Sequence, residues 1–143
     1  MREIGWYEFW LPILSGLGQQ CYHPCKDVRQ HAMTYFQRSL LSPELDRSMT
    51  VDVIQECFQH VIFPLVDELL KPEIVSLDAH GMDETRMRAI ALMGKIFLHH
   101  LTTLLTSKDM PILWVAILDR ITRYLNSDSS DFLVCSLVSL PVC

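Results

Sequence analysis

Several features that would indicate other protein classes are scarce in this sequence. Only 5 of its 143 residues are glycine, and strand-like alternation of apolar and polar residues is rare, so we predict no β-sheet. It has no glycine-rich phosphate loop and no Gly-x-Ser-x-Gly elbow, so it lacks the sequence signatures of P-loop nucleotide-binding proteins and of α/β-hydrolases. No apolar run approaches the roughly 20 residues that a transmembrane helix needs.

Positively charged residues are also fewer than negatively charged ones. The chain has 12 Lys and Arg residues against 17 Asp and Glu residues, which gives a formal net charge of −5. A nucleic-acid-binding domain normally carries a basic surface, so this balance predicts no nucleic-acid partner. It also disfavours electrostatic adhesion of the whole chain to anionic lipid, while leaving room for a local lipid contact.

The five cysteines form an odd, irregularly spaced set, and the first ten residues lack the features of a secretory signal peptide. Reduced thiols in a cytoplasmic chain are therefore expected. The segment Cys21-x-x-x-Cys25 brackets His23, but a zinc site would need two more ligands, and no partner motif supplies them. Adjacent helical residues diverge by about 100°, so His99 and His100 are not expected to face one centre. We predict no metal, no cofactor and no catalytic residue.

One pattern is present three times. An apolar-Pro-apolar-apolar step surrounds Pro12, Pro64 and Pro111, and these prolines are 52 and 47 residues apart. HEAT and armadillo arrays, in which each unit is a pair of helices, repeat about every 40–47 residues. Half of the residues are hydrophobic, which indicates helices with broad buried faces. We predict an all-α, HEAT/armadillo-like helical repeat (α-solenoid) fragment of about five to six helices.

The 3.6-residue periodicity predicts two helix pairs, each made of a proline-bearing helix and a partner helix. A third proline-bearing helix follows them. Pro64 falls inside its helix and is expected to bend or split it. Asp109 is expected to cap the fifth helix, and 127–131 to cap a sixth, truncated one. The expected helices and the loop between the third and fourth are 6–20, 26–41, 50–70, a loop at 71–81, 83–106 and 110–126.

The densest charged run is Asp83-Glu84-Thr85-Arg86-Met87-Arg88. One interpretation is a solvated helix start, because the acids suit the positive end of the helix dipole. The alternative is an internal ladder, in which Arg86 and Arg29 pair with carboxylates of neighbouring repeats. The sequence leaves both interpretations open.

Several segments resemble one known family. They are 10–14, 28–41, 61–65, the string Gly81-Met82-Asp83-Glu84-Thr85-Arg86-Met87-Arg88-Ala89, 113–119 and 129–131. Together they resemble the C-terminal helical region, called "homology downstream of Sec-seven", of the large Golgi brefeldin A-resistance type guanine-nucleotide exchange factors for Arf GTPases. The resemblance covers about residues 6–131 and is most specific at 81–89. The family-like residues, expected to act in structure or interaction, are Pro12, Arg29, Pro64, Gly81, Met82, Asp83, Glu84, Thr85, Arg86, Arg88 and Trp114.

The resemblance implies a non-catalytic role. In that family the exchange reaction belongs to a separate Sec-seven domain, so no catalytic residue is carried over and the chain alone is not expected to be an enzyme. The implied role is regulatory scaffolding in Golgi and early-secretory vesicle traffic, by contact with the exchange domain, with Arf-pathway proteins or peripherally with lipid. The implied location is cytoplasmic, peripherally associated with Golgi or early-secretory membranes.

The resemblance also divides the chain. Residues 1–131 are expected to form the helical repeat region, about two and a half helix pairs, and residues 132–143 read as a divergent apolar tail. Such an abrupt tail suggests a fragment, an alternative transcript end or a gene-model artefact. The alternative function is a free-standing helical adaptor that binds a partner helix in a groove between repeats. A small thiol or metal enzyme is a third hypothesis, which the missing motifs disfavour.

Overall fold

The computed structural model describes residues 5–127, and every regular element within that range is helical. The predicted all-α helical repeat is therefore confirmed. In chain order the elements are η1 (Trp6–Trp10), α2 (Leu11–Gln20), α3 (Lys26–Leu40), α4 (Pro43–Asp46), α5 (Val51–Cys57), η2 (Phe58–Ile62), α6 (Phe63–Glu68), α7 (Pro72–Val75), α8 (Ala79–His99), α9 (Leu101–Leu104) and α10 (Met110–Asn126).

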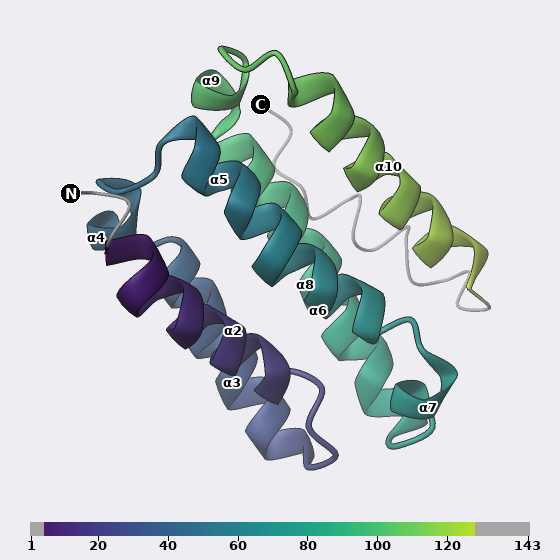
Figure 1. The fold of residues 1–143 in the computed structure, drawn as a ribbon. Helices are drawn as coiled ribbons and strands as arrows, with labels where there is room; N and C mark the ends of the chain where they lie inside the picture. The colour runs from purple at the N-terminus through teal and green to yellow at the C-terminus, as the bar shows by residue number, and fades with distance from the viewer. Residues whose placement is uncertain (1–4, 128–143) are drawn as a thin grey trace.

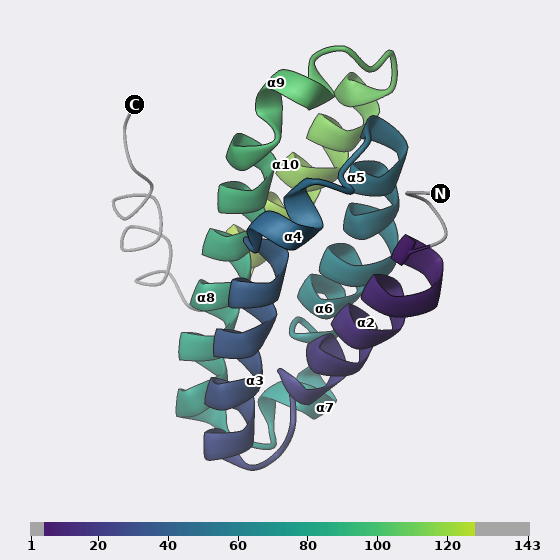
Figure 2. The ribbon, with the colours of Figure 1, turned by 90° about the vertical axis from the view of Figure 1, so that its left-hand side faces the viewer.

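The long helices stack in two layers. The first layer holds η1–α2, then α5–η2–α6, then α10, and the second layer holds α3 and α8 (Figure 1). Helix α2 packs on its partner α3 and on η2 of the next pair, while α3 packs on α8 (Figure 2). Each helix pair thus covers the apolar faces of the next pair, as in other helical arrays.

Two of the three repeated prolines follow the same unusual turn. Residues Trp6–Trp10 and Phe58–Ile62 each form a π-helical turn, and Pro12 and Pro64 each come two residues after its end. In a straight α-helix the proline ring would clash with the carbonyl four residues earlier. The wider turn relieves that clash, because the residue before each proline bonds five residues back. The sequence predicts that Pro64 bends or splits its helix; the helix is not split but runs on through Pro64, with the π-helical turn accommodating the proline.

Because π-helical turns are rare, the same turn at the same offset from two prolines 52 residues apart supports a true structural repeat. The residues at matching places are also buried alike, since Trp6 and Phe58 have no exposed surface. Pro111 differs. It lies at the second position of α10, where no backbone donor is required and no widened turn precedes it.

Three predicted boundaries are wrong. The expected loop at 71–81 contains the short helix α7, and α8 begins at Ala79 rather than at Asp83. The cause is Asp78, whose carboxylate accepts a hydrogen bond from the Gly81 amide at 3.1 Å and so caps α8 earlier. Helix α8 ends at His99 and not near Thr106, with α9 following it.

The expectation for Asp109 is confirmed only in part. It occupies the residue before α10, but its side chain makes no capping hydrogen bond. The proposed tail at 132–143 and the cap at 127–131 lie outside the described residues, except for Ser127. Within residues 5–127 no helix is both long enough and apolar enough to cross a bilayer.

Candidate functional site

An ion pair between a buried arginine and a partly exposed aspartate joins the first helix pair to the second. Arg29 of α3 has a relative exposure of 1%, and its Nη2 lies 2.5 Å from Oδ2 of Asp78. Its Nη1 donates to the carbonyl oxygens of His23 and Pro24 at 2.9 and 3.0 Å. One guanidinium therefore holds the turn before α3 and the first turn of α8 together.

Gly81 makes this junction possible. A Cβ atom at this position would overlap both the Asp78 carboxylate and the Arg29 guanidinium. The Gly81 amide and, after it, the Arg29 guanidinium lower the pKa of the Asp78 carboxyl group. Asp78 is therefore ionised at neutral pH, and its charge faces the positive end of the α8 dipole.

The rest of the family-like string also serves packing. Met82 is fully buried, and the Thr85 hydroxyl donates to the Gly81 carbonyl at 3.1 Å. Arg86 is 6% exposed, and its Nε donates to the Leu69 carbonyl at 2.7 Å. Arg88 donates to the Thr34 hydroxyl of α3 at 3.2 Å. Most of this string therefore faces its neighbours within the array.

These contacts decide between the two interpretations of the charged run. A solvated helix start is wrong for Thr85 and Arg86, which are buried, although Glu84 is exposed. The ladder interpretation is correct for Arg29, whose guanidinium pairs with the Asp78 carboxylate at the start of α8 in the second helix pair. It is wrong for Arg86, whose carboxylate contact is Asp83 in its own helix, at 3.8 Å.

The other family-like residues lie elsewhere. Pro12 and Pro64 follow the two π-helical turns, and both prolines are exposed. Trp114 of α10 stacks on Phe97 of α8 with ring centroids 5.1 Å apart and an interplanar angle of 28°. The predicted residues thus do not converge on one centre, since only Arg29 and the 81–89 string come together.

The outer helix α10 exposes apolar side chains that the sequence interpretation missed. We call this surface the α10 apolar face. Its members are at least 41% exposed and include Ile112 and Val115, at 69% and 64%. The opposite side of α10 is anchored by Tyr124, whose hydroxyl donates to the Val66 carbonyl at 2.9 Å. The α10 apolar face consists of Ile112, Trp114, Val115, Leu118 and Leu125.

A sequence signal for this surface existed. Helix α10 carries more apolar residues than one buried stripe can hold, so some of them had to face outward. Trp114 and Leu125 read as inward from periodicity alone, yet they are 41% and 45% exposed. Large exposed apolar patches of this kind mark interaction sites.

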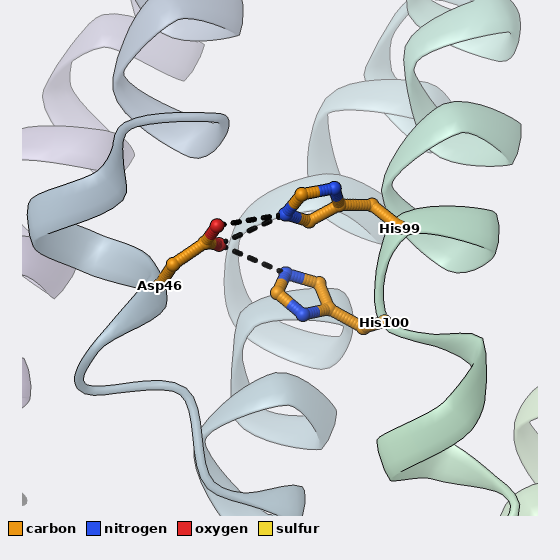
Figure 3. A group of neighbouring side chains, drawn as sticks. All are labelled: Asp46, His99 and His100. Carbon is orange, nitrogen blue, oxygen red and sulfur yellow. Dashed lines mark hydrogen bonds and ion pairs between the residues drawn. The ribbon is translucent and has the colours of Figure 1, made fainter.

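The two adjacent histidines contact the same carboxylate, contrary to expectation. The Nε2 atom of His99 lies 2.9 and 3.0 Å from the Asp46 oxygens, and Nε2 of His100 lies 3.8 Å from Oδ1 (Figure 3). The 100° divergence applies only inside a helix, and α8 ends at His99. The backbone of His100, with φ −103° and ψ 11°, leaves the helix and turns its ring back toward Asp46.

Two of the three described thiols, those of Cys21 and Cys57, are poor nucleophiles. Burial raises the pKa values of Cys21 and Cys57 to about 12, so both are protonated at neutral pH. Cys25 is exposed, and its backbone amide donates to Nδ1 of His23. Among residues 5–127 the one group of three or more His, Cys, Asp or Glu residues with converging ligand atoms is Asp46, His99 and His100.

The family described as "GBF1-like, tetratrico peptide repeat region" matches residues 10–138 of the chain. The Golgi-specific brefeldin A-resistance guanine nucleotide exchange factor 1 homolog of Caenorhabditis elegans is 34% identical over 87% of the chain. Two Arabidopsis thaliana proteins, the ARF guanine-nucleotide exchange factors GNOM and GNL1, are 32% and 26% identical over 87% and 89% of it. The chain spans only 6%, 8% and 9% of these three relatives. No solved structure matches the chain.

Proposed function

Because the chain belongs to the large Arf guanine-nucleotide exchange factor family, in its GBF1-like tetratrico peptide repeat region, we propose that it is a non-catalytic scaffolding segment of such a factor. In this proposal it binds another part of the same protein through the α10 apolar face. One relative is named as Golgi-specific, which supports a role in Golgi and early-secretory vesicle traffic. We further propose a cytoplasmic location with peripheral attachment to those membranes.

The α10 apolar face is the observation that supports docking. Helix α10 is the last helix of the first layer, so one of its sides has no neighbouring helix pair among the described residues (Figure 1). Outer units of helical arrays normally carry polar caps. Here Ile112 and Val115, both apolar, are the most exposed residues of the face. A neighbour that covers them would bury apolar surface, which is favourable in water.

We propose another helical segment of the same exchange factor as the occupant of this face. Trp114 and Leu118 lie four residues apart, so they form the kind of ridge that fits the groove of a second helix. The exposed charges of the same helix, Asp119 and Arg123, pair with each other at 3.1 Å, so this side of α10 suits an apolar helix better than an acidic or basic ligand. The chain spans only 6% of the length of the C. elegans relative. The rest of such a protein is long enough to contain this helical segment.

The family-like string supports the non-catalytic part of the proposal. Two of its members are already engaged within the array: the buried Arg86 binds the Leu69 carbonyl, and the half-buried Arg88 holds α8 against α3. A catalytic residue would instead face a site that a substrate can reach. The string therefore reads as a structural signature of the array.

A nucleotide-release assay tests this part directly. An Arf GTPase loaded with a fluorescent guanine nucleotide would be mixed with an excess of the purified chain. We expect the release rate to equal the intrinsic rate, while a Sec-seven domain added as a positive control accelerates it. Acceleration by the chain alone would overturn the non-catalytic proposal.

A free-standing adaptor is the second candidate function, and one observation favours it. A groove of about 170 Å³ runs between α2 and α6, with Gly18, Tyr22 and Pro64 among its lining residues. It lies between two repeats, where an adaptor would receive a partner helix. Substitution of Ser15, a half-buried residue that lines the groove from α2, by Leu would fill this groove and abolish adaptor binding, but it would leave docking on the α10 apolar face intact.

A further inference from the structure

We propose that Asp46, His99 and His100 form a binding site for a divalent transition-metal ion of the zinc class. The site lies where α4 faces the end of α8, at the opposite end of that helix from the start of the family-like string (Figure 3). The proposed scaffolding role does not require a metal ion, so a test of metal binding at this site is independent of that role.

The spacing of the ligand atoms supports the site. Zinc bonds imidazole nitrogen and carboxylate oxygen at about 2.0–2.2 Å, so two ligands of a tetrahedral site lie about 3.3 Å apart. The two histidine-to-carboxylate distances in the structure, 2.9 and 3.8 Å, bracket that value. All three ligand atoms lie within 4.8 Å of one another. Small side-chain rotations would bring them to a common ion.

His100 provides an independent observation. Its side chain is 7% exposed, and its Nε2 atom is buried without any hydrogen-bond partner. The nearest carboxylate oxygen, Oδ1 of Asp46, lies at 3.8 Å, which is too far for a hydrogen bond. Buried polar atoms nearly always have a hydrogen-bond partner, so a buried imidazole nitrogen that faces a carboxylate without one requires an explanation. A metal ion between the two groups would use the free lone pair.

An ordinary ion pair explains only half of this arrangement. Protonated His99 would pair well with Asp46, since Nε2 contacts both carboxylate oxygens. It would leave the neighbouring imidazole of His100 unsatisfied, and the two rings lie with centroids only 4.7 Å apart. A metal ion satisfies both histidines and the carboxylate at the same time.

The donor set indicates which metals fit. Two imidazoles with one carboxylate suit zinc, copper or nickel, whereas calcium and magnesium prefer sites built entirely from oxygen. The protein supplies three ligands, and the side chains of His99 and Asp46 are 40% and 33% exposed. The fourth position therefore faces solvent and would take water or an external ligand. When bound, the ion would link α4, which follows the first helix pair, to the end of the second.

The test is a titration of the reduced, metal-free chain with Zn²⁺, followed by calorimetry, and with Co²⁺, followed by visible absorption. We expect one ion per chain and cobalt d–d bands without a thiolate charge-transfer band. His99→Gln and Asp46→Asn change partly exposed side chains and should leave the fold intact by circular dichroism. Each should weaken Zn²⁺ binding by more than about tenfold. His80→Gln, an exposed histidine of the same helix, is the matched control and should not change the affinity.

Three results would overturn the proposal. The first is the absence of saturable Zn²⁺ binding, and the second is unchanged affinity in His99→Gln and Asp46→Asn. The third is a cobalt spectrum with a thiolate band that disappears in a Cys25→Ser variant, because binding would then belong to a cysteine. The buried His100 is left unchanged in these variants, so a folding defect cannot imitate loss of the site.

Discussion

The guanidinium of Arg29 lies 2.5 Å from the carboxylate of Asp78, 49 residues later in the chain. This contact joins α3 to the capping residue of α8, and therefore joins the first helix pair to the second. The same guanidinium fixes the turn before α3 through two carbonyl oxygens. A single buried side chain thus ties the turn before α3 to the residue that caps the longest helix.

Arg29→Met should destabilise the chain by about 2 kcal/mol, because the carbonyl oxygens of His23 and Pro24 lose their donors. Methionine fills much of the space of the arginine stem, so lost volume contributes little. Chemical denaturation followed by circular dichroism measures the change in the free energy of unfolding. Arg38→Met, an exposed arginine of the same helix, should change it by less than about 0.5 kcal/mol. Equal effects of the two variants would contradict the role of Arg29.

Gly81→Ala should lower the stability by about 1–3 kcal/mol, although alanine is the better helix former. The added methyl group has no room, because it would overlap both Asp78 and Arg29. Gly16→Ala is the matched control, since nothing lies within 4 Å of its Cβ position and the site is exposed. We expect that variant to raise the stability by up to about 1 kcal/mol. Thermal unfolding would show the two shifts, and shifts of the same sign would refute this account of Gly81.

Pro64→Ala should change the free energy of unfolding by less than about 1 kcal/mol. A proline forced into a straight helix costs about 3 kcal/mol, so its removal would then be strongly stabilising. The π-helical turn at Phe58–Ile62 already relieves that clash, which leaves little to gain. Urea denaturation distinguishes the two cases. A gain close to 3 kcal/mol would show that the turn does not relieve the proline.

Cys25 should be the one fast-reacting thiol among Cys21, Cys25 and Cys57. Cys21 and Cys57 are buried, and burial raises their pKa values to about 12, so neither forms a thiolate at neutral pH. A thiol-reactive dye would be used on a chain with Cys135 and Cys143 replaced by serine, since these lie outside the described residues. We expect one rapid label per native chain and three after denaturation. Rapid labelling of a second thiol would contradict the burial.

Much of the fold follows from local patterns. The 3.6-residue periodicity located the first pair of helices to within a residue or two, and the spacing of Pro12 and Pro64 matches the spacing of the two π-helical turns, which the sequence did not predict. The start of α8 could not be found in this way. Its cap, Asp78, gains its partner Arg29 only after the chain has folded back over 49 residues.

The sites were harder to predict, because they depend on tertiary geometry. Helical spacing alone separates His99 from His100, and only the end of α8 between them brings both rings to Asp46. The exposed side of α10 was hidden for a different reason. Val115 and Ile112 look like core residues in sequence, and only the position of α10 at the edge of the array leaves them exposed.

Hydrogen–deuterium exchange of α10 tests the docking role most directly. The amides of residues 112–118 would be compared between the isolated chain and a full-length exchange factor that carries this sequence. If another segment covers the α10 apolar face, exchange in the full-length protein should be slower by about tenfold or more. Val115→Glu should remove that protection, whereas Val28→Glu, the same change on α3, should not. Equal exchange in the isolated chain and the full-length protein would contradict the proposal that this surface holds the array within a larger exchange factor.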